Sequence, residues 1–345
     1  MLWLVLEFLL YYARYQWNDV RGIDNDRLHP ARHLRARLPV GVTEADRRRS
    51  VNTSLAAAST RVAIAVLVGI ALGMVEAVAI LAIAVCLSAA VYEGVRSRST
   101  PRPSYTPNLS VVGVWLTVGL GYMIRVGLGL ALVGIPLGSA TMAVGLIWAY
   151  AFGTMYVLLS WALETSNHCA RTGTALAVAE EARRKPHIAA LVRFLDPQGG
   201  PPTIRPVREP ISPSTPGHLG SVPALAHRTA VGCPWNLALI ASAPLSSLLG
   251  ADLAGIPSWP GGLVAAFVCL GGATGLRWST GSPLRWAVAA AAGLVLALLA
   301  AGATSPWAAP IPWLAVAACY SWLRSSSYLA AMGAGAQSRA ATSGT

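Results

Sequence analysis

The chain has 345 residues, of which 54% are hydrophobic and only 12% are charged, whereas soluble globular proteins carry about 25% charged residues. The few charges are one-sided, with 26 Lys+Arg against 14 Asp+Glu and a formal net charge of +12. A soluble nucleic-acid-binding protein would carry far more polar residues, and a disordered basic tail would lack the long Ala/Val/Leu/Ile runs. We therefore expect an all-α, polytopic membrane protein without a nucleic-acid partner.

Stretches of apolar residues predict about nine transmembrane helices within a single domain, 1–345. A helix that crosses a bilayer needs about 17–25 apolar residues. The pair of stretches at 54–94 must turn tightly near Glu76. The nine stretches are 1–17, 54–72, 74–94, 109–133, 138–163, 233–251, 261–277, 284–303 and 308–323.

The distribution of basic residues predicts the orientation of these helices. Cytoplasmic loops accumulate Lys and Arg, and here such residues follow the first, third, fifth, seventh and ninth stretches. The loops near 252–260 and 304–308 contain no Lys or Arg. This alternation predicts an N-terminus outside, a C-terminus inside and basic loops in the cytoplasm.

A cytoplasmic insertion is expected at 176–232, between the fifth and sixth helices. Its part 197–217 is Pro-rich, which is typical of a mobile excursion. The preceding part, 176–195, has two interpretations: an amphipathic helix lying along the membrane surface, or an ordinary solvated helix.

Carboxylates and amides gather at the cytoplasmic end of the first helix. Asp19, Asp24 and Asp26 lie within eight residues of one another, beside Asn18 and Asn25. Oxygen ligands without sulfur suit a hard cation, Mg²⁺ before Ca²⁺ or zinc, and Mg²⁺ usually shares its coordination sphere with phosphate and water.

Arginines follow this acidic stretch directly, and guanidinium groups bind phosphate oxygens bidentately. Carboxylates followed by arginines at the end of a membrane helix indicate a site for a metal-bridged diphosphate. The alternative is a solvated, positive-inside loop with incidental acids. The arginines concerned are Arg32, Arg35 and Arg37.

The stretch Asn18-Asp-Val-Arg-Gly-Ile-Asp-Asn-Asp26-Arg-Leu-His-Pro30, followed by Arg35-Ala-Arg-Leu-Pro-Val-Gly41, resembles the first Asp-rich motif of the UbiA superfamily of intramembrane prenyltransferases. Within that superfamily it looks most like the decaprenyl-phosphate phosphoribosyltransferase-like branch. Gly121-Tyr-Met-Ile-Arg125-Val-Gly-Leu-Gly129 resembles the fifth helix of the family. Glu164-Thr-Ser-Asn-His168-Cys-Ala-Arg-Thr-Gly-Thr174 stands where the second motif is expected.

The resemblance implies a bundle around a central prenyl cavity and a Mg²⁺ site, with departures from the family pattern. Gly22 occupies the position of the first metal-binding aspartate, so that Asp26 is the matched carboxylate. Asp24 replaces the missing ligand if the helix ends at Gly22. The implied metal ligands are Asp19, Asp24, Asp26, Glu164 and His168, and all of these except His168 are the implied catalytic residues.

Other residues are implied to hold the rest of the substrate. A charge at the depth of Arg125 costs about 2.5–3.5 kcal/mol on insertion scales, so its side chain should face a cavity or pair with an acid. Glu7 lies at a similar depth in the first helix. The implied diphosphate-binding residues are Asn18, Arg32, Arg35, Arg37 and Arg125, and the implied cavity residues are Tyr15, Tyr150, Tyr156 and Trp161.

Together the residues and the resemblance imply a Mg²⁺-dependent prenyltransferase of the bacterial plasma membrane, with its active-site loops in the cytoplasm. Such an enzyme ionises an isoprenyl diphosphate and transfers the prenyl group to a lipophilic acceptor among the membrane lipids. One alternative is an intramembrane terpene cyclase, which closes the cation on itself. A second is a non-catalytic or transport-type protein on a decayed scaffold, which Gly22 and His168 favour. A third, sugar transfer, is suggested by the branch alone.

Overall fold

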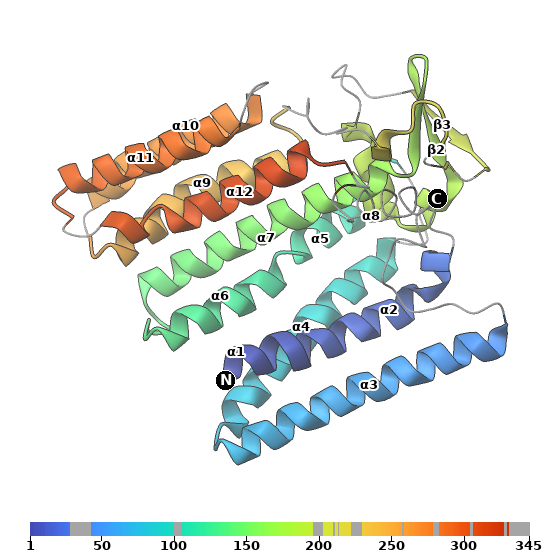
Figure 1. Cartoon of the computed structure of the whole chain (residues 1–345), viewed down its shortest axis with the longest axis horizontal. Coiled ribbons are helices and arrows are strands. Elements are labelled where there is room, and N and C mark those ends of the chain that lie inside the picture. The colour runs from blue at the N-terminus through green and yellow to red at the C-terminus, as the bar shows by residue number, and fades with distance from the viewer. Residues whose placement is uncertain are drawn as a thin grey trace, which may run out of the picture.

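The computed structural model describes residues 1–27, 43–99, 105–195, 203–209, 211–212, 214–221, 230–256, 259–278, 283–303, 306–327 and 330, and for 25–27 and 259–261 it describes the backbone alone. The described chain is mostly helical, and its long helices lie side by side (Figure 1). Met1 lies at one end of these helices, and α12 (Ile311–Ser325) finishes at the other.

The first group of helices is N-terminal. A continuous helix consists of α1 (Leu2–Leu4), a π-helical stretch (Val5–Tyr11) and α2 (Tyr12–Arg27). It packs beside α3 (Glu44–Ala71) and α4 (Val75–Ser99).

The second group contains the remaining long helices. They are α5 (Leu109–Thr117), α6 (Leu120–Leu132), α7 (Ala140–Ser166), α9 (Pro234–Leu253), α10 (Trp259–Trp278), α11 (Leu284–Ala300) and α12.

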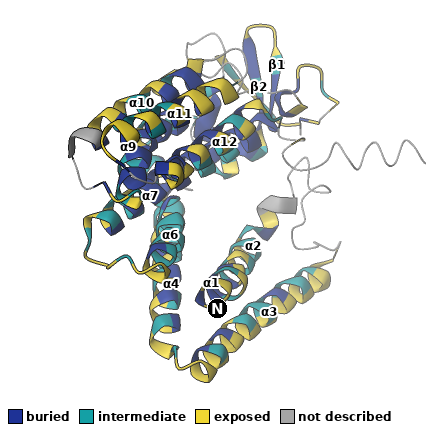
Figure 2. Ribbon diagram, turned by 60° about the vertical axis from the view of Figure 1, so that its left-hand side comes forward, coloured by how far each residue is buried: buried dark blue, intermediate teal, exposed yellow. Residues whose placement is uncertain are grey.

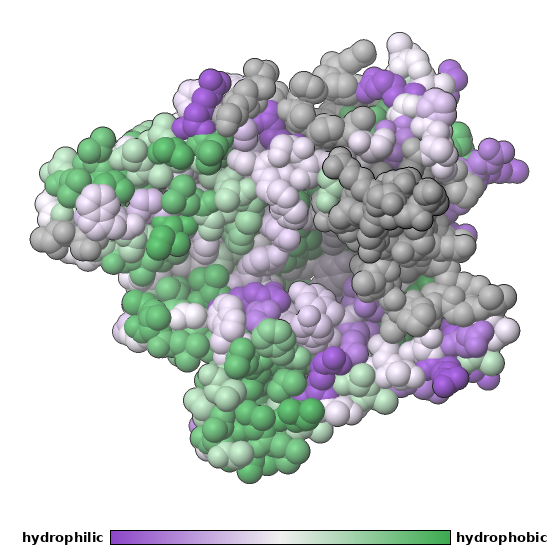
Figure 3. Space-filling view, in the orientation of Figure 1, coloured by the Kyte–Doolittle hydropathy of each residue, from purple (hydrophilic) through white to green (hydrophobic). Residues whose placement is uncertain are grey.

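Five of the described helical segments are long and apolar enough to cross a membrane: α3, α4, the α5–α6 segment Leu109–Leu132, α7 and α9. Gly262–Trp278 and Leu284–Ala300 are apolar but shorter. Hydrophobic side chains cover much of the molecule, and hydrophilic ones gather toward the end where the sheet lies (Figure 3). The structure thus has the helices of a membrane protein, and the number nine stays a prediction.

Two of the expected helices extend beyond their apolar stretches. The helix expected over 1–17 continues to Arg27, and the one expected from residue 54 begins at Glu44. A capping box explains the early start, because Thr43 Oγ1 accepts from the Asp46 backbone N–H (3.1 Å) and the Asp46 carboxylate accepts from the Thr43 N–H (3.1 Å). Hydropathy locates the lipid-spanning part of a helix and misses such polar extensions.

A small sheet, which the sequence did not predict, accompanies the helices. Strand β1 (Cys169–Thr172) pairs antiparallel with β2 (Ala175–Ala179), and β3 (Thr203–Val207) pairs parallel with β2. The β1–β2 turn contains Gly173 at φ 60°, a conformation that glycine adopts without a steric penalty.

Both interpretations of 176–195 as a helix are wrong. After β2 the chain forms 3₁₀ turns around the short helix α8 (Pro186–Ala189). Pro186 lacks the N–H that an uninterrupted helix needs at this position. Earlier in the segment, the backbone groups of β2 form their hydrogen bonds within the sheet rather than within a helix. The Pro-rich part 197–217 lies partly outside the described residues, and its described portion includes β3.

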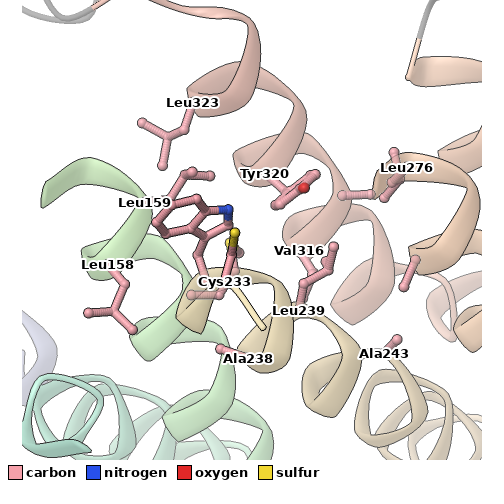
Figure 4. Packing of buried hydrophobic residues seen from close by; sticks show 14 of the residues in the cluster. Leu158, Leu159, Cys233, Ala238, Leu239, Ala243, Leu276, Val316, Tyr320 and Leu323 are labelled. Carbon is pink, nitrogen blue, oxygen red and sulfur yellow. The ribbon is translucent and has the colours of Figure 1, made fainter. Parts of the chain in front are cut away.

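Two separate hydrophobic cores stabilise the two groups of helices, whose buried and exposed faces Figure 2 shows. The smaller core joins the first helix to α3 and α4 through residues such as Leu6, Ala65 and Val78. The larger core is centred on α7, α9 and α12, where Leu159, Leu239 and Tyr320 are fully buried (Figure 4).

Close helix contact at Gly153 gives a test of this packing. A Cβ added to Gly153 of α7 would lie 2.8 Å from the Cβ of Tyr122 on α6, whereas one added to Gly271 of α10 meets no atom within 4 Å. We expect Gly153→Ala to destabilise the protein by about 1–3 kcal/mol through overpacking. Gly271→Ala should leave stability unchanged or raise it, because alanine favours the helix. Thermal unfolding in detergent measures both, and equal effects would contradict the packing.

Candidate functional site

The end of α2 and the end of α4 meet in a network of charged and polar side chains. Arg96 of α4 donates to the Asn18 Oδ1 of α2 (3.3 Å) and pairs with Glu93 (3.0 Å). Arg21 of α2 approaches the other oxygen of the same Glu93 carboxylate (3.4 Å). Asn18, from the first sequence motif, is therefore held by a basic residue of another helix.

The second sequence motif contributes Glu164 to the same region. Glu164 ends α7, is 9% exposed, and accepts from the Lys185 ammonium at 3.1 Å. The charges of Arg96, Lys185 and Glu164 all act on the buried ring of His187 in α8. Arg96 thus contacts the first motif directly, and it acts on the same His187 ring as Glu164 of the second motif. We call Asn18, Arg21, Glu93, Arg96, Glu164 and Lys185 the polar cluster.

The carboxylates of the first motif are placed differently from the prediction. Because α2 continues past Gly22 to Arg27, the expected helix end that would turn Asp24 inward is wrong. Asp24 instead accepts two hydrogen bonds from Arg47 of α3 (3.1 and 3.0 Å), and its side chain is 65% exposed. Asp19 is half-buried on α2. The side chain of Asp26 and the residues Arg32, Arg35 and Arg37 lie outside the described residues.

The residues that the structure describes do not fit a Mg²⁺ site. Glu164 is hydrogen-bonded to Lys185, Asp24 is engaged by Arg47, and His168 is buried at the end of α7 with 4% of its surface exposed. Within the described ranges, no three His, Cys, Asp or Glu side chains come together around a common point. The Mg²⁺ prediction therefore depends on Asp26 and the residues after it.

Arg125 has an acidic partner, as its depth in the bundle requires. Its guanidinium donates to both oxygens of Glu7 (2.6 and 3.1 Å), a fork-like pair between α6 and the π-helical stretch. The Tyr15 hydroxyl lies 3.3 Å from the same group, and the ring of Tyr11 lies 3.6 Å from its central carbon. Tyr15, a predicted cavity residue, is thus part of this pair's surroundings.

An apolar groove of about 530 Å³ lies between α5, α7 and α9. Trp115, Tyr150 and Phe194 supply its aromatic surface, and Leu237 and Ala241 belong to its α9 wall. Of the four predicted cavity residues, Tyr150 lines this groove. Sequence reasoning missed the contribution of α9, because an apolar residue of a membrane helix looks the same whether it faces lipid or a groove.

The other predicted cavity residues form aromatic contacts elsewhere on α7. Tyr156 lies 6.1 Å from Tyr122 and 6.4 Å from Phe152, centroid to centroid. Trp161 lies 4.8 Å from the ring of His187. Trp161 therefore lies next to the polar cluster, and Tyr156 lies at the contact between α6 and α7.

A hydrogen bond connects the groove to α8, next to the polar cluster. The indole N–H of Trp115, which lines the groove, donates to the backbone carbonyl of His187 at 2.8 Å. His187 lies two residues after Lys185. The groove therefore adjoins α8, which Lys185 of the polar cluster immediately precedes.

Comparisons with models of known protein families, with curated proteins and with solved structures find no match for this chain. The family resemblance consequently rests on the sequence motifs alone.

The Glu7–Arg125 pair predicts a specific pattern of stability. Glu7→Gln leaves the Arg125 charge without its counter-ion in a low-dielectric region, so we expect a loss of about 3 kcal/mol. Adding Arg125→Gln should recover most of this loss, because the uncompensated charge is removed. Unfolding by detergent titration measures the free energies. Glu76→Gln, at an exposed position, is the control. An equal loss of stability in that variant would contradict the role of Glu7 as the counter-ion of Arg125.

The environment of His187 predicts a pH dependence. Burial, and then the positive charges of Arg96 and Lys185, lower the pKa of His187 to about 3. Below about pH 6.5 the unfolded chain binds a proton that the folded protein excludes, so stability falls as the pH falls. We expect His187 to contribute about 2 kcal/mol of this loss between pH 7.5 and pH 5.

The variant His187→Phe tests this contribution. Phenylalanine keeps the ring contact with Trp161, and the His187 Nδ1 that it removes is buried without a hydrogen bond. Thermal unfolding at the two pH values should show a smaller acid effect in the variant. An unchanged acid effect would mean that His187 is not the group responsible.

Proposed function

We propose that this chain is a UbiA-type intramembrane enzyme that binds an isoprenyl diphosphate and transfers its prenyl group to a lipophilic acceptor. One observation carries the proposal. Arg96 binds Asn18 of the first Asp-rich stretch, and its charge acts on the ring of His187 together with that of Glu164 from the second stretch. The backbone carbonyl of the same His187 accepts a hydrogen bond from Trp115, which lines an apolar groove.

The polar cluster suits the diphosphate end of such a substrate. Arg21, Arg96 and Lys185 carry positive charge against two carboxylates, Glu93 and Glu164. Guanidinium and ammonium groups bind phosphate oxygens through charge-assisted hydrogen bonds. In a partly buried site these bonds are stronger than in water.

The groove suits the isoprenyl end. Its volume lies within the range of about 300–1,000 Å³ that is usual for small-molecule sites, and its walls are almost entirely apolar side chains of α5, α7 and α9. The rings of Trp115, Tyr150 and Phe194 present π faces, which attract a cation. A chain in this groove places its head toward the polar cluster, because Trp115 bonds to His187.

The proposed reaction follows from these two halves. The allylic C–O bond breaks, its electron pair leaves with the diphosphate, and the cations of the cluster stabilise the charge that develops there. The groove keeps water from the allylic cation. A nucleophilic carbon or oxygen of the acceptor then forms the new bond and loses a proton. We assign no step to Mg²⁺, since the described residues do not fit it.

A second candidate is a non-catalytic protein that binds or moves a prenyl or lipid phosphate. The pairs Asp24–Arg47 and Glu164–Lys185 favour it, because they engage two carboxylates that were expected to replace metal ligands of the family. The terpene cyclase shares the substrate with the transferase, and the products separate the two.

Filling the groove tests the binding mode. Ala241 lines the groove and is exposed, so Ala241→Trp should occupy the channel without disturbing the core. We expect binding of geranylgeranyl diphosphate to weaken by tenfold or more, about 1.4 kcal/mol. Ala143→Trp, at an exposed position of α7 outside the groove, is the matched control and should bind normally. Equal binding by both variants would contradict the groove as the chain site.

The products decide between the candidate functions. Membranes that contain the protein are incubated with geranylgeranyl diphosphate, with and without added lipid extract, and analysed by mass spectrometry. A prenylated lipid supports the transferase, and a cyclic hydrocarbon formed without acceptor supports the cyclase. Tight binding with neither product supports the non-catalytic protein.

A further inference from the structure

A cation of the protein, from outside the second motif, pairs with the motif's Glu164, which is expected to be a metal ligand. Glu164 accepts from the Lys185 ammonium at 3.1 Å, and the two side chains are only 12% and 18% exposed. Lys185 is the one lysine of the chain, whose other basic residues are all arginine. A buried carboxylate is thus neutralised by an ammonium group that belongs to the fold.

A divalent cation would compete with this arrangement. Mg²⁺ demands oxygen ligands at 2.0–2.1 Å in near-octahedral geometry, and the Glu164 carboxylate already accepts a hydrogen bond from Lys185. Mg²⁺ bound there would also lie beside Lys185 and near Arg96, whose charge acts on the same His187 ring. Like charges at such distances repel strongly where water is scarce.

We propose that the polar cluster binds diphosphate with no divalent cation bound to Glu164. Lys185 and Arg96 contact the phosphate oxygens directly. Glu164 acts as a positioning residue that holds the Lys185 ammonium at the end of α7. This inference rests on the proposed function and replaces a metal-bridged contact by a direct one.

The chemistry of lysine agrees with this role. An ammonium on a flexible stem is a compact point charge that can turn from one oxygen to another, whereas a guanidinium is fixed by its planar fork. Lys185 immediately precedes α8, and its charge acts on the His187 ring. It is therefore placed to share its hydrogen bonds between Glu164 and an arriving phosphate.

Calorimetric titration of inorganic pyrophosphate into the full-length protein in detergent tests the inference. Wild-type protein is compared in buffer stripped of divalent cations by a chelating resin and in buffer with excess Mg²⁺. We expect binding in the buffer without divalent cations, because the direct contacts need none. Binding that occurs only with Mg²⁺ would overturn the inference and leave the proposed function standing. A lack of binding in both buffers would overturn both.

Two variants isolate the role of Lys185, and both replace Glu164 by glutamine so that removal of the ammonium leaves no buried carboxylate without its partner. Glu164→Gln keeps the ammonium, and Glu164→Gln with Lys185→Met removes it. In metal-free buffer the double variant should bind pyrophosphate about tenfold more weakly than Glu164→Gln, the effect of one charge-assisted hydrogen bond. Equal affinities would overturn the direct contact. Lys185→Arg, which retains the charge, should keep most of the binding.

Discussion

Charges buried between helices need partners, and this requirement determines how the first helix packs against its neighbours in both groups. In a low-dielectric interior an unpaired charge costs several kcal/mol. The Glu7–Arg125 pair joins the first helix to α6, and Arg96 joins α4 to Asn18 of α2. Apolar contacts supply most of the buried area within each group of helices, whereas these polar contacts fix where the first helix lies.

Irregular backbone occurs where the polar contacts form. Glu7 and Tyr11, which surround Arg125, belong to the π-helical stretch of the first helix, and such stretches are frequent at functional sites. The segment expected at 109–133 is interrupted between α5 and α6, where a Cβ on Gly119 would lie 2.8 Å from the ring of Tyr150. This interruption brings α5 and the Tyr150 side of α7 together at the groove.

Hydropathy predicts the apolar helices well and the polar parts of the chain poorly. The bounds expected for the helix at 138–163 differ from those of α7 by a few residues, because membrane solvation determines that segment locally. The sheet could not be predicted, since β2 and β3 pair through contacts distant in sequence. A charged residue in a membrane helix predicts that a partner exists, and Arg125 has one. The charge alone does not identify the partner, which for Glu164 is Lys185, 21 positions further along the chain.

The charge balance of the polar cluster bears on what the site attracts. Its described members include three cations and two carboxylates. Burial, with Arg96 and Lys185, lowers the pKa of the adjacent His187. A network that served packing alone would gain most from balanced charges, whereas a positive surplus in a partly buried site attracts an anion. A soluble anion would satisfy the cluster equally well, but it would leave the adjoining groove exposed to lipid. A phosphate attached to a long apolar chain satisfies both, so the combination favours a lipid phosphate, the class to which the proposed substrate belongs, over a free anion.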